Sequence, residues 1–331
     1  MESITKTKLT KQELQRLVLE NFSCNMRDYT ELNEGHMNSI YRITLDSNKA
    51  PHDEVILKVS YFPNKEVLIY EREIMRAEVQ VYQLLSSKGL PIPKILKYDF
   101  SHNTIDADYF FMTPVIGMSW ESLKDEISPD AKETLMKELG KYQAIIHSVS
   151  NDSFGYYKDG TCAFTTWADA FMSMMQNIVN DGKARAIELP YDEIMDAVSK
   201  RVDLLNEVSE PQLVDFDLWA GNVLLDKKDD DWYISGIIDF ERAFFGDPFA
   251  DFIASVNIYT DISQEAQFIE GYRSICESFK VTEHDKERMT LYRLYMNVIL
   301  AVETYRYDAN YGKMIQMYCG RVITGLLSEL L

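Results

Sequence analysis

A strand-rich island in an otherwise helical half of the chain constrains the fold most. Residues 223–225 (VLL) and 232–240 (WYISGIIDF) are strand-like runs, and the acidic stretch DKKDDD lies between them. This pattern predicts an antiparallel hairpin with a solvated turn. Because such a hairpin brings its outer ends together, Asn222 at its entry and Asp239 at its exit should be neighbours. Asp217 lies one short loop upstream, so we expect two acids and one amide at one edge of a small sheet.

Two different regions surround this hairpin. Apolar periodicity predicts C-terminal helices over residues 129–149, 191–208, 265–280, 286–306 and 311–331. The N-terminal region reads as a short helix (11–21), strands within 30–45, 54–59 and 109–117, and a long helix (65–86). We therefore expect an α+β protein with a small antiparallel-sheet N-terminal lobe and a larger, mostly helical C-terminal lobe. The break TPVIG predicts lobes over 1–112 and 118–331 with a hinge at 113–117.

The composition argues against several classes of protein. A chain of 331 residues is too long for one ordinary core and fits two lobes. The net charge of −19 makes nucleic acid a poor partner. The four cysteines are scattered, which argues against a zinc site or a disulfide framework and suits a reducing compartment. The N-terminus lacks the apolar core of a secretory signal, and no apolar run is long enough to span a membrane. We expect a cytoplasmic protein that binds neither membrane nor nucleic acid.

The oxygen-rich cluster at the hairpin suggests a metal site. Mg²⁺ prefers one or two carboxylates together with phosphates and water. The alternative is a capped turn whose buried polar groups are satisfied by backbone, and this is the commoner fate of any one such residue. The spacing D-x-x-x-x-N is weak evidence for a metal site when it is taken alone. The prediction therefore needs support from elsewhere in the chain.

A lysine and a glutamate supply that support. Lys58 lies on the face of the 54–59 strand opposite Val55, Leu57 and Val59. Glu78 falls inside the apolar stripe of the 65–86 helix, where a carboxylate is costly unless it is paired. Lys58 is the expected partner, although a solvated edge lysine is the commoner fate of a strand lysine. Glu71, one to two turns earlier, is the second candidate for the pairing acid.

These residues, in this order, resemble the kinase-like phosphotransferases. The resemblance is closest to the aminoglycoside phosphotransferase group, which includes choline-kinase-like and fructosamine-kinase-like enzymes, and it extends from about Leu32 to Ile258. The stretches that carry it are LPIPKIL, LGKYQAIIHS, SFGYY, FTTWADAF and, most specifically, IIDFERAFFGDPFADF. The D-F-G and A-P-E elements of protein kinases are absent. The resemblance implies a protein-kinase-like bilobal fold.

The resemblance also implies roles for individual residues. Asp217 matches the catalytic aspartate, which orients the acceptor hydroxyl and takes its proton. Asn222 and Asp239 match the Mg²⁺ ligands. Lys58 matches the lysine on the α- and β-phosphates of ATP, and Glu78 matches the acid that holds this lysine.

Further positions match the nucleotide-binding parts of the family. Asn38 and Ser39 correspond to the turn that cradles phosphates. Backbone groups near Thr113 and Val115 would hold the adenine. Met112 could line the same pocket, although core packing explains it equally well.

One position departs from the family. Asp215 stands where the family usually has a histidine that braces the metal-binding turn, and an ionised aspartate cannot donate a hydrogen bond. It also places a second carboxylate near Asp217, which could raise a pKa or attract a cation. We expect His147 to be a structural hydrogen bonder. Asp247 and Asp251 are expected to cap and brace the helix that begins near Pro248.

The implied activity is an ATP- or GTP-dependent and Mg²⁺-dependent transfer of the γ-phosphate to a hydroxyl of a small molecule. Transfer should be direct, because no nucleophile motif is present. Acids that could face a cleft (Asp169, Glu303 and Asp308) and the net charge make a cationic acceptor such as an aminoglycoside plausible. Choline, an amino sugar or a sugar is the alternative acceptor. A nucleotide-binding module without turnover is the alternative of another class.

Overall fold

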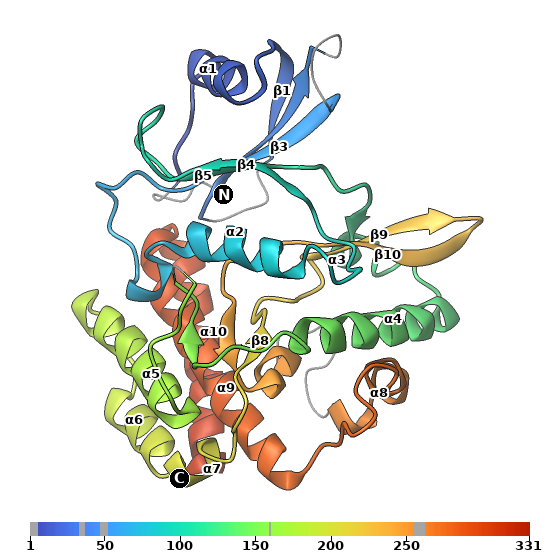
Figure 1. The fold of residues 1–331 in the computed structure, drawn as a ribbon. Coiled ribbons are helices and arrows are strands. Elements are labelled where there is room, and N and C mark those ends of the chain that lie inside the picture. The colour runs from blue at the N-terminus through green and yellow to red at the C-terminus, as the bar shows by residue number, and fades with distance from the viewer. Residues whose placement is uncertain (1–5, 33–36, 47–51, 159, 254–261) are drawn as a thin grey trace. The chain divides into compact units, whose positions relative to one another are not determined.

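Two units of different construction make up the chain. The computed structural model describes residues 6–32, 37–46, 52–158, 160–253 and 262–331. One unit comprises residues 1–67 and 92–115, and the other comprises residues 68–91 and 116–331. The first contains the antiparallel sheet and the second contains most of the helices, so the predicted α+β class is confirmed (Figure 1). Segment 68–91, which the sequence placed in the N-terminal lobe, groups with the second unit.

The first unit is a five-stranded antiparallel sheet with a helix on one face. Its elements are α1 (Lys11–Phe22), β1 (Met26–Leu32), β2 (Ser39–Leu45), β3 (Glu54–Val59), β4 (Ile95–Asp99) and β5 (Tyr109–Met112). The strand order is β1-β2-β3-β5-β4. Side chains of α1 pack in one core with Val55, Leu57 and Val59 of β3. Because side chains alternate along a strand, Lys58 takes the opposite face, as expected.

The second unit is mainly helical. Its helices are α2 (Ile74–Leu85), α3 (Trp120–Leu123), α4 (Pro129–His147), α5 (Trp167–Ala184), α6 (Tyr191–Ser199), α7 (Val202–Leu205), α8 (Ala266–Arg273), α9 (Glu283–Val302) and α10 (Ala309–Leu330). The 3-10 turns are η1 (Ile69–Glu71), η2 (Pro248–Ile253), η3 (Ile262–Gln264) and η4 (Glu303–Arg306). The short strands are β6 (Met118–Ser119), β7 (Gly155–Tyr156), β8 (Gln212–Val214), β9 (Val223–Lys228), β10 (Asp231–Ile237) and β11 (Phe244–Gly246). No helix in these described ranges is both long and apolar enough to cross a membrane.

The predicted hairpin is present as β9 and β10. Its turn is tight, and both of its central residues have positive φ, 51° at Asp229 and 70° at Asp230. Short polar residues tolerate this conformation, which matches the twist of paired strands. At the open end the Ile238 N–H donates to the carbonyl of Asn222 at 3.0 Å. The two ends therefore meet as predicted, and Asn222 lies beside the chain that leads into Asp239.

Helix α5 was not predicted, and it organises an aromatic core. Trp167 at its start is fully buried and stacks on Phe244 of β11, with ring centroids 5.5 Å apart. A Cβ on Gly246 would lie 2.5 Å from the Trp167 ring, so the strand passes too close for any other residue. The stretch FTTWADAF did contain a signal for the start of this helix. The Thr166 side chain caps it by accepting the Asp169 N–H.

Three predicted helices are shorter or interrupted. The 65–86 helix begins only at Ile74, because Glu73, the N-cap of α2, has φ of 62° and cannot continue a helix from the preceding 3-10 turn. The 191–208 helix is broken near Arg201, whose Nε donates to Glu287 of α9 at 2.8 Å. The 265–280 helix ends at Arg273. These breaks arise from backbone conformation and from tertiary contacts. Neither is visible in the apolar periodicity of the sequence.

Candidate functional site

The loop between β8 and β9 carries the predicted catalytic residue. Phe216 in this loop has φ of 63°, a left-handed conformation that is strained for a bulky residue. The Asp251 carboxylate holds the loop by accepting the N–H groups of Asp215 and Phe216. His147 Nε2 lies 2.8 Å from the same carboxylate, and its Nδ1 lies 2.8 Å from the Tyr272 hydroxyl. The structural role predicted for His147 is confirmed. Asp247 caps the turn after Pro248 as predicted, by accepting the Phe249 N–H at 3.1 Å, whereas Asp251 braces this loop and not the helix for which it was predicted.

Asp217 follows directly and remains accessible, with 22% of its side chain exposed. The Asn222 amide donates from Nδ2 to the backbone carbonyl of Asp217 at 2.9 Å. This orientation leaves Asn222 Oδ1 as the atom that could accept a cation. The local geometry therefore brings the predicted base and one predicted metal ligand into contact.

The environment of Asp217 tunes its acidity. Burial raises the pKa of Asp217 to about 7, and neighbouring Asp239 adds to this effect. Arg242 opposes it, because the Arg242 Nε lies 3.8 Å from Asp217 Oδ2. A carboxyl whose pKa lies near neutral pH suits general-base chemistry.

Arg242 belongs to a buried network that sequence analysis missed. Its Nη2 donates to Glu303 Oε1 at 2.9 Å, and the Tyr70 hydroxyl donates to the same oxygen. Arg306 pairs with Glu71 beside them. Glu303 is therefore buried and paired inside the second unit, although the sequence suggested that it faces a cleft. Arg242 stood in the quoted stretch IIDFERAFFGDP, but nothing in the pattern singled it out.

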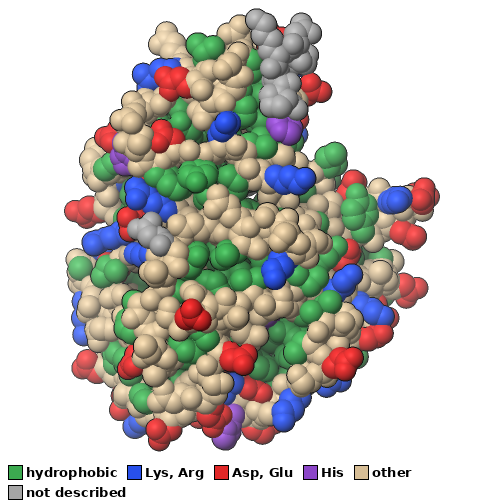
Figure 2. Space-filling view, viewed as in Figure 1, with side chains coloured by type: hydrophobic (Ala, Val, Ile, Leu, Met, Phe, Trp, Pro, Cys, Tyr) green, Lys and Arg blue, Asp and Glu red, His purple; other side chains and the backbone are tan. Residues whose placement is uncertain are grey.

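The other two acids that the sequence suggested for a cleft lie at the N-terminal ends of helices. Asp308 is the N-cap of α10, where Oδ1 accepts the N–H groups of Asn310 and Tyr311 at 3.1 Å. Asp169 accepts the Thr166 hydroxyl at 2.7 Å in the first turn of α5, and it also lines an open hollow of about 480 Å³. Figure 2 shows acidic side chains interspersed with basic ones over the visible face of the second unit.

An oxygen-rich group lies at the exit of the hairpin. One carboxylate oxygen each from Glu78, Asp239 and Glu241 lies within 4.8 Å of the others. Asp239 has φ of 72°, and its N–H donates to the Tyr82 hydroxyl at 3.0 Å, which fixes its turn. Oxygen donors alone are what Mg²⁺ takes, so these residues fit that ion. Glu241 was not predicted, although it lies only two positions after Asp239.

Asp215, the departure from the family pattern, is fully buried. Neither of its carboxylate oxygens has a hydrogen-bond partner among the described residues. Burial raises its pKa well above the ordinary value, and the nearby Asp251 and Asp217 raise it further. Its carboxyl therefore favours the neutral form more strongly than an exposed aspartate does.

The first unit holds the predicted phosphate-binding residues. Ser39 begins β2 and pairs with Val59 of β3, while Ile40 pairs with Lys58. Asn38, Ser39 and Lys58 are all buried, so Lys58 is not the solvated edge lysine of the alternative reading. Gly35, which the sequence pattern places in the turn with Asn38, lies outside the described residues. The pairing of Lys58 with Glu78 joins one residue of each unit and stays a prediction.

The predicted adenine-binding segment follows β5. Met112 is buried at the end of β5 and pairs with Ile56. The Thr113 N–H donates to the Lys94 carbonyl at 3.0 Å, so this group is already occupied. Val115 is the last residue of the first unit. The contacts that Met112, Thr113 and Val115 make to a nucleotide stay predictions.

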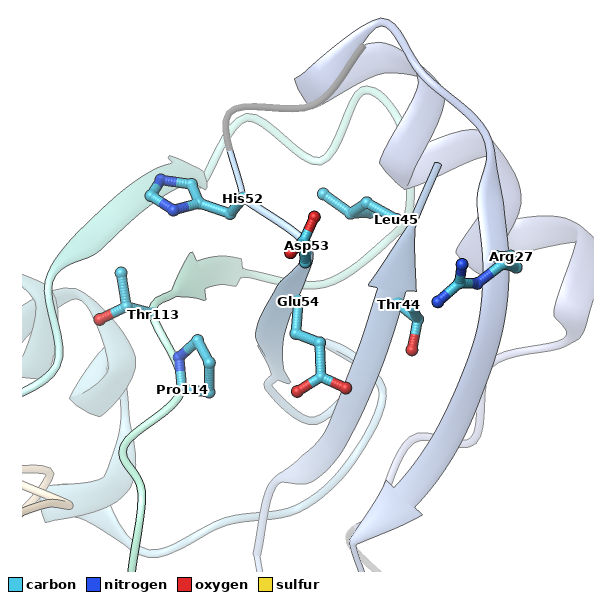
Figure 3. Close-up of a pocket in the computed structure, with 8 residues that line it drawn as sticks. All are labelled: Arg27, Thr44, Leu45, His52, Asp53, Glu54, Thr113 and Pro114. Atoms are coloured by element: carbon cyan, nitrogen blue, oxygen red, sulfur yellow. The ribbon is translucent and has the colours of Figure 1, made fainter. Parts of the chain in front are cut away.

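A polar hollow of about 590 Å³ on the first unit is lined in part by Thr113 of this segment. Figure 3 shows Arg27, Thr44 and Glu54 coming from three strands, with Thr113 and Pro114 on the other side. Thr44 pairs with Glu54, whereas Ser39 pairs with Val59 at the opposite end of the same two strands. The hollow is therefore far along the sheet from the predicted phosphate turn.

Solved structures of known proteins share this fold. The chain is 17% identical to a putative fructosamine-3-kinase from Thermobifida fusca, with a TM-score of 0.65 over 95% of this chain and 98% of that one. It is 18% identical to aminoglycoside phosphotransferase APH(4)-Ia in complex with AMP-PNP and hygromycin B, with a TM-score of 0.62 over 94% and 98% of the two chains. At these identities the likeness shows the fold, and the predicted kinase-like fold is confirmed.

Curated relatives include 4-hydroxytryptamine kinases from Psilocybe cyanescens and Psilocybe cubensis. Each is 24% identical, over 66% and 59% of this chain. The matched region spans 64% and 56% of the length of those relatives. The model of the phosphotransferase enzyme family matches residues 28–286. The chain therefore belongs to the phosphotransferase enzyme family, which confirms the resemblance that its motifs indicated.

Proposed function

We propose that this protein transfers the γ-phosphate of ATP, with Mg²⁺, to a hydroxyl group of a small molecule. The observation that carries the proposal is the environment of Asp217. This carboxyl is accessible, has a pKa near 7, and contacts the amide of Asn222. An acid of this kind can take a proton from an alcohol during transfer.

Each residue of the site would have its own role. Asp217 orients the acceptor hydroxyl and takes its proton, and Arg242 keeps Asp217 from holding that proton too tightly. Asn222 and Asp239 would hold Mg²⁺, with Glu78 or Glu241 near enough to assist. When bound, the ion neutralises charge on the phosphate oxygens.

The nucleotide would be held by the first unit. Lys58, Asn38 and Ser39 would bind its phosphates, and the backbone around Met112, Thr113 and Val115 would bind its base. The APH(4)-Ia complex named above contains an ATP analogue, which supports ATP, and GTP remains the alternative. We keep the functional lobes at 1–112 and 118–331 with a hinge at 113–117.

The acceptor is a small molecule with a hydroxyl group. Relatives act on 4-hydroxytryptamine by name, and the APH(4)-Ia complex contains hygromycin B. An aminoglycoside, choline, an amino sugar or a sugar is a candidate for this chain. A cytoplasmic location agrees with the use of ATP and with the free thiols of Cys24, Cys162, Cys276 and Cys319.

The test is Asp217→Asn, which keeps the shape of the side chain and removes the base. We expect the rate of ATP-dependent phosphorylation to fall by about 10²–10⁴-fold, while ATP affinity changes little. Phosphate transfer is measured over a panel of aminoglycosides, amines and sugars, and ATP binding by calorimetry. Asp203→Asn, an exposed acid in α7, is the matched control. Full activity in Asp217→Asn would show that another group is the base.

The second candidate is a nucleotide-binding module without turnover. The unpartnered Asp215 favours it, because the family's usual bracing residue is missing. Tight Mg·ATP binding with no transfer to any acceptor of the panel would support it. Transfer to any one acceptor would exclude it.

A further inference from the structure

The two carboxylate oxygens of Asp217 have different surroundings. The Asn222 amide donates to Oδ2 at 3.5 Å, and Arg242 Nε lies 3.8 Å from the same oxygen. Oδ1 forms no hydrogen bond with any described residue, and unlike the two carboxylate oxygens of Asp215 it is not fully buried. One oxygen of Asp217 therefore faces protein groups, while the other is left for a molecule from outside.

The Nε–H group of Arg242 is a buried donor beside Oδ2. It has no hydrogen-bond partner among the described residues. A buried donor without a partner costs free energy, so a nearby acceptor should capture it. Asp217 Oδ2, at 3.8 Å, lies just beyond hydrogen-bond distance. Hydrogen bonds of catalytic groups are often long at rest and tighten in the complex that reacts.

The far end of Arg242 is fixed by a buried acid. Its Nη2 donates to Glu303 Oε1 at 2.9 Å, and the Tyr70 hydroxyl donates to the same oxygen. Burial opposes the ionisation of Glu303, but Arg242 and Arg306 outweigh it and lower the pKa of this carboxyl. Glu303 is therefore a charged anchor, and it determines where the guanidinium of Arg242 lies.

An arginine suits this place better than a lysine would. The planar guanidinium carries several donors in a rigid fork, so Nη2 can bind Glu303 while Nε faces Asp217. Lysine carries one compact ammonium group, which would bind one of the two acids and release the other. All three residues belong to the second unit of the chain.

We propose that Arg242 is the positioning residue of the base: Glu303 holds Arg242, Arg242 Nε holds Oδ2 of Asp217, and Oδ1 is thereby presented to the acceptor hydroxyl. Oδ1 takes the hydroxyl proton while the hydroxyl oxygen bonds to the γ-phosphorus of ATP. The bond from that phosphorus to its bridging oxygen breaks, and the bridging oxygen leaves with ADP. This inference rests on the proposed phosphotransferase activity and adds two residues that act through Asp217.

Steady-state kinetics of Arg242 variants test the positioning role. The acceptor is the compound from the panel of aminoglycosides, amines and sugars that the wild-type protein phosphorylates fastest. We expect Arg242→Lys to lower kcat by about tenfold and Arg242→Ala by about a hundredfold, with the KM for ATP unchanged, because misplacing a reacting group mainly slows the chemical step. Arg288→Lys is the matched control and should keep the wild-type kcat, because Arg288 is also buried and paired, with Asp247 and Asp285.

A double-mutant cycle tests whether Glu303 acts through Arg242. Glu303→Gln keeps the shape of the side chain and removes its charge. We expect it to lower kcat by about fivefold when Arg242 is present and to cause no further loss in Arg242→Ala, since residues that act as a unit are not additive. Thermal unfolding checks that each variant is folded. If Glu303→Gln does not fold, Tyr70→Phe takes its place, because it removes one hydrogen bond to the same carboxylate oxygen.

The contact itself is measured without catalysis. Nitrogen-15 NMR of the full chain observes arginine Nε–H groups, and the signal of Arg242 is the one lost in Arg242→Lys. We expect this signal to shift in Asp217→Asn and to keep its position in Arg288→Lys. A change in the signal reports the proximity of Nε to the Asp217 carboxylate, whatever the acceptor is.

The outcomes separate this inference from the proposed function. While the wild type transfers phosphate, the proposed function stands, and the inference alone is overturned by any of three results. These are a wild-type kcat in Arg242→Lys, equal losses from Glu303→Gln in both backgrounds, and an Nε–H signal that is unchanged in Asp217→Asn. A raised KM for ATP in Arg242→Lys also overturns it, because Arg242 would then bind phosphate directly. If the wild type phosphorylates no acceptor, the proposed function fails, and the positioning role fails with it even where the NMR contact is seen.

Discussion

Two aspartates in one loop show how strongly the surroundings decide the chemistry of a side chain. Burial raises the pKa of Asp217 to about 7 although Arg242, 3.8 Å away, lowers it, so this partly exposed carboxyl can gain and lose a proton near neutral pH. Asp215, two positions earlier, is fully buried without a hydrogen-bond partner among the described residues. Its proton is retained because ionisation would leave an unpaired charge in the core. The first is therefore suited to catalysis, while the second costs stability.

Replacing Asp215 should make this cost measurable. The pKa of Asp215 is raised in the folded state, so the folded protein keeps a proton that the unfolded chain releases above about pH 3.9. Stability therefore falls as the pH rises above that value. Asp215→Asn removes the titration, and we expect it to stabilise the protein by about 1–3 kcal/mol at pH 7.

The gain from Asp215→Asn should disappear at about pH 3, where the wild-type carboxyl is largely protonated in both states. Urea unfolding at the two pH values measures it. Asp203→Asn, on the surface of α7, should change stability little at either pH. A loss of stability at pH 7 in Asp215→Asn would mean that the carboxyl has a favourable partner.

Helices α4 and α8 pack unusually closely because glycines lie where they cross. A Cβ on Gly271 of α8 would lie 1.8 Å from the carbonyl oxygen of Lys137 in α4. A Cβ on Gly140 of α4 would lie 2.1 Å from the carbonyl oxygen of Phe268 in α8. Neither backbone can move without separating the helices. This contact also supports His147, at the end of α4, which contacts Tyr272 of α8.

A methyl group at this crossing should therefore be costly. We expect Gly271→Ala to destabilise the protein by about 1–3 kcal/mol, since overpacking forces the helices apart. Gly325→Ala in α10 is the matched control, because a Cβ there would meet nothing within 4 Å. It should stabilise the protein by about 0.5–1 kcal/mol through helix propensity. Equal changes in the two variants, measured by thermal unfolding, would show that the crossing is not tight.

The net charge of the protein affects its stability through repulsion among the charges on its surface. The net charge of −19 arises from 53 acidic and 34 basic residues. Many acids have local roles, such as helix caps and the buried pairs around Glu303. The remainder repel one another over distances that salt shortens from about 30 Å at 0.01 M to about 8 Å at 0.15 M. Self-repulsion of this kind opposes the compact state.

Added salt should therefore stabilise this protein. We expect the Tm at pH 7 to rise by about 2–4 °C between 10 mM and 150 mM NaCl, because screening reduces the repulsion. The control is the same series at pH 4.7, the isoelectric point of the sequence, where the salt effect should be absent. A Tm at pH 7 that falls or stays constant with salt would show that attractive ion pairs outweigh the repulsion.

Local pattern was enough to predict the features that depend on neighbours in sequence. The hairpin, the meeting of Asn222 with the strand before Asp239, and the face of Lys58 all follow from strand periodicity and short connections. The family resemblance followed from contiguous motifs of the same kind. Helix ends were predicted less well, because Glu73 and Arg201 respond to backbone conformation and distant partners.

Other features depend on residues far apart in the chain. Arg242, Glu303, Tyr70 and Arg306 meet through contacts that span up to 233 positions, and no local pattern connects them. The pKa of Asp217 and the raised pKa of Asp215 likewise depend on residues brought together by folding. The hairpin, the α+β class and the family were therefore readable from the chain, and the reacting groups that it indicates stay predictions. The acidity of these groups and their ion pairs came from folding, because burial and long-range contacts set the energy of a charge.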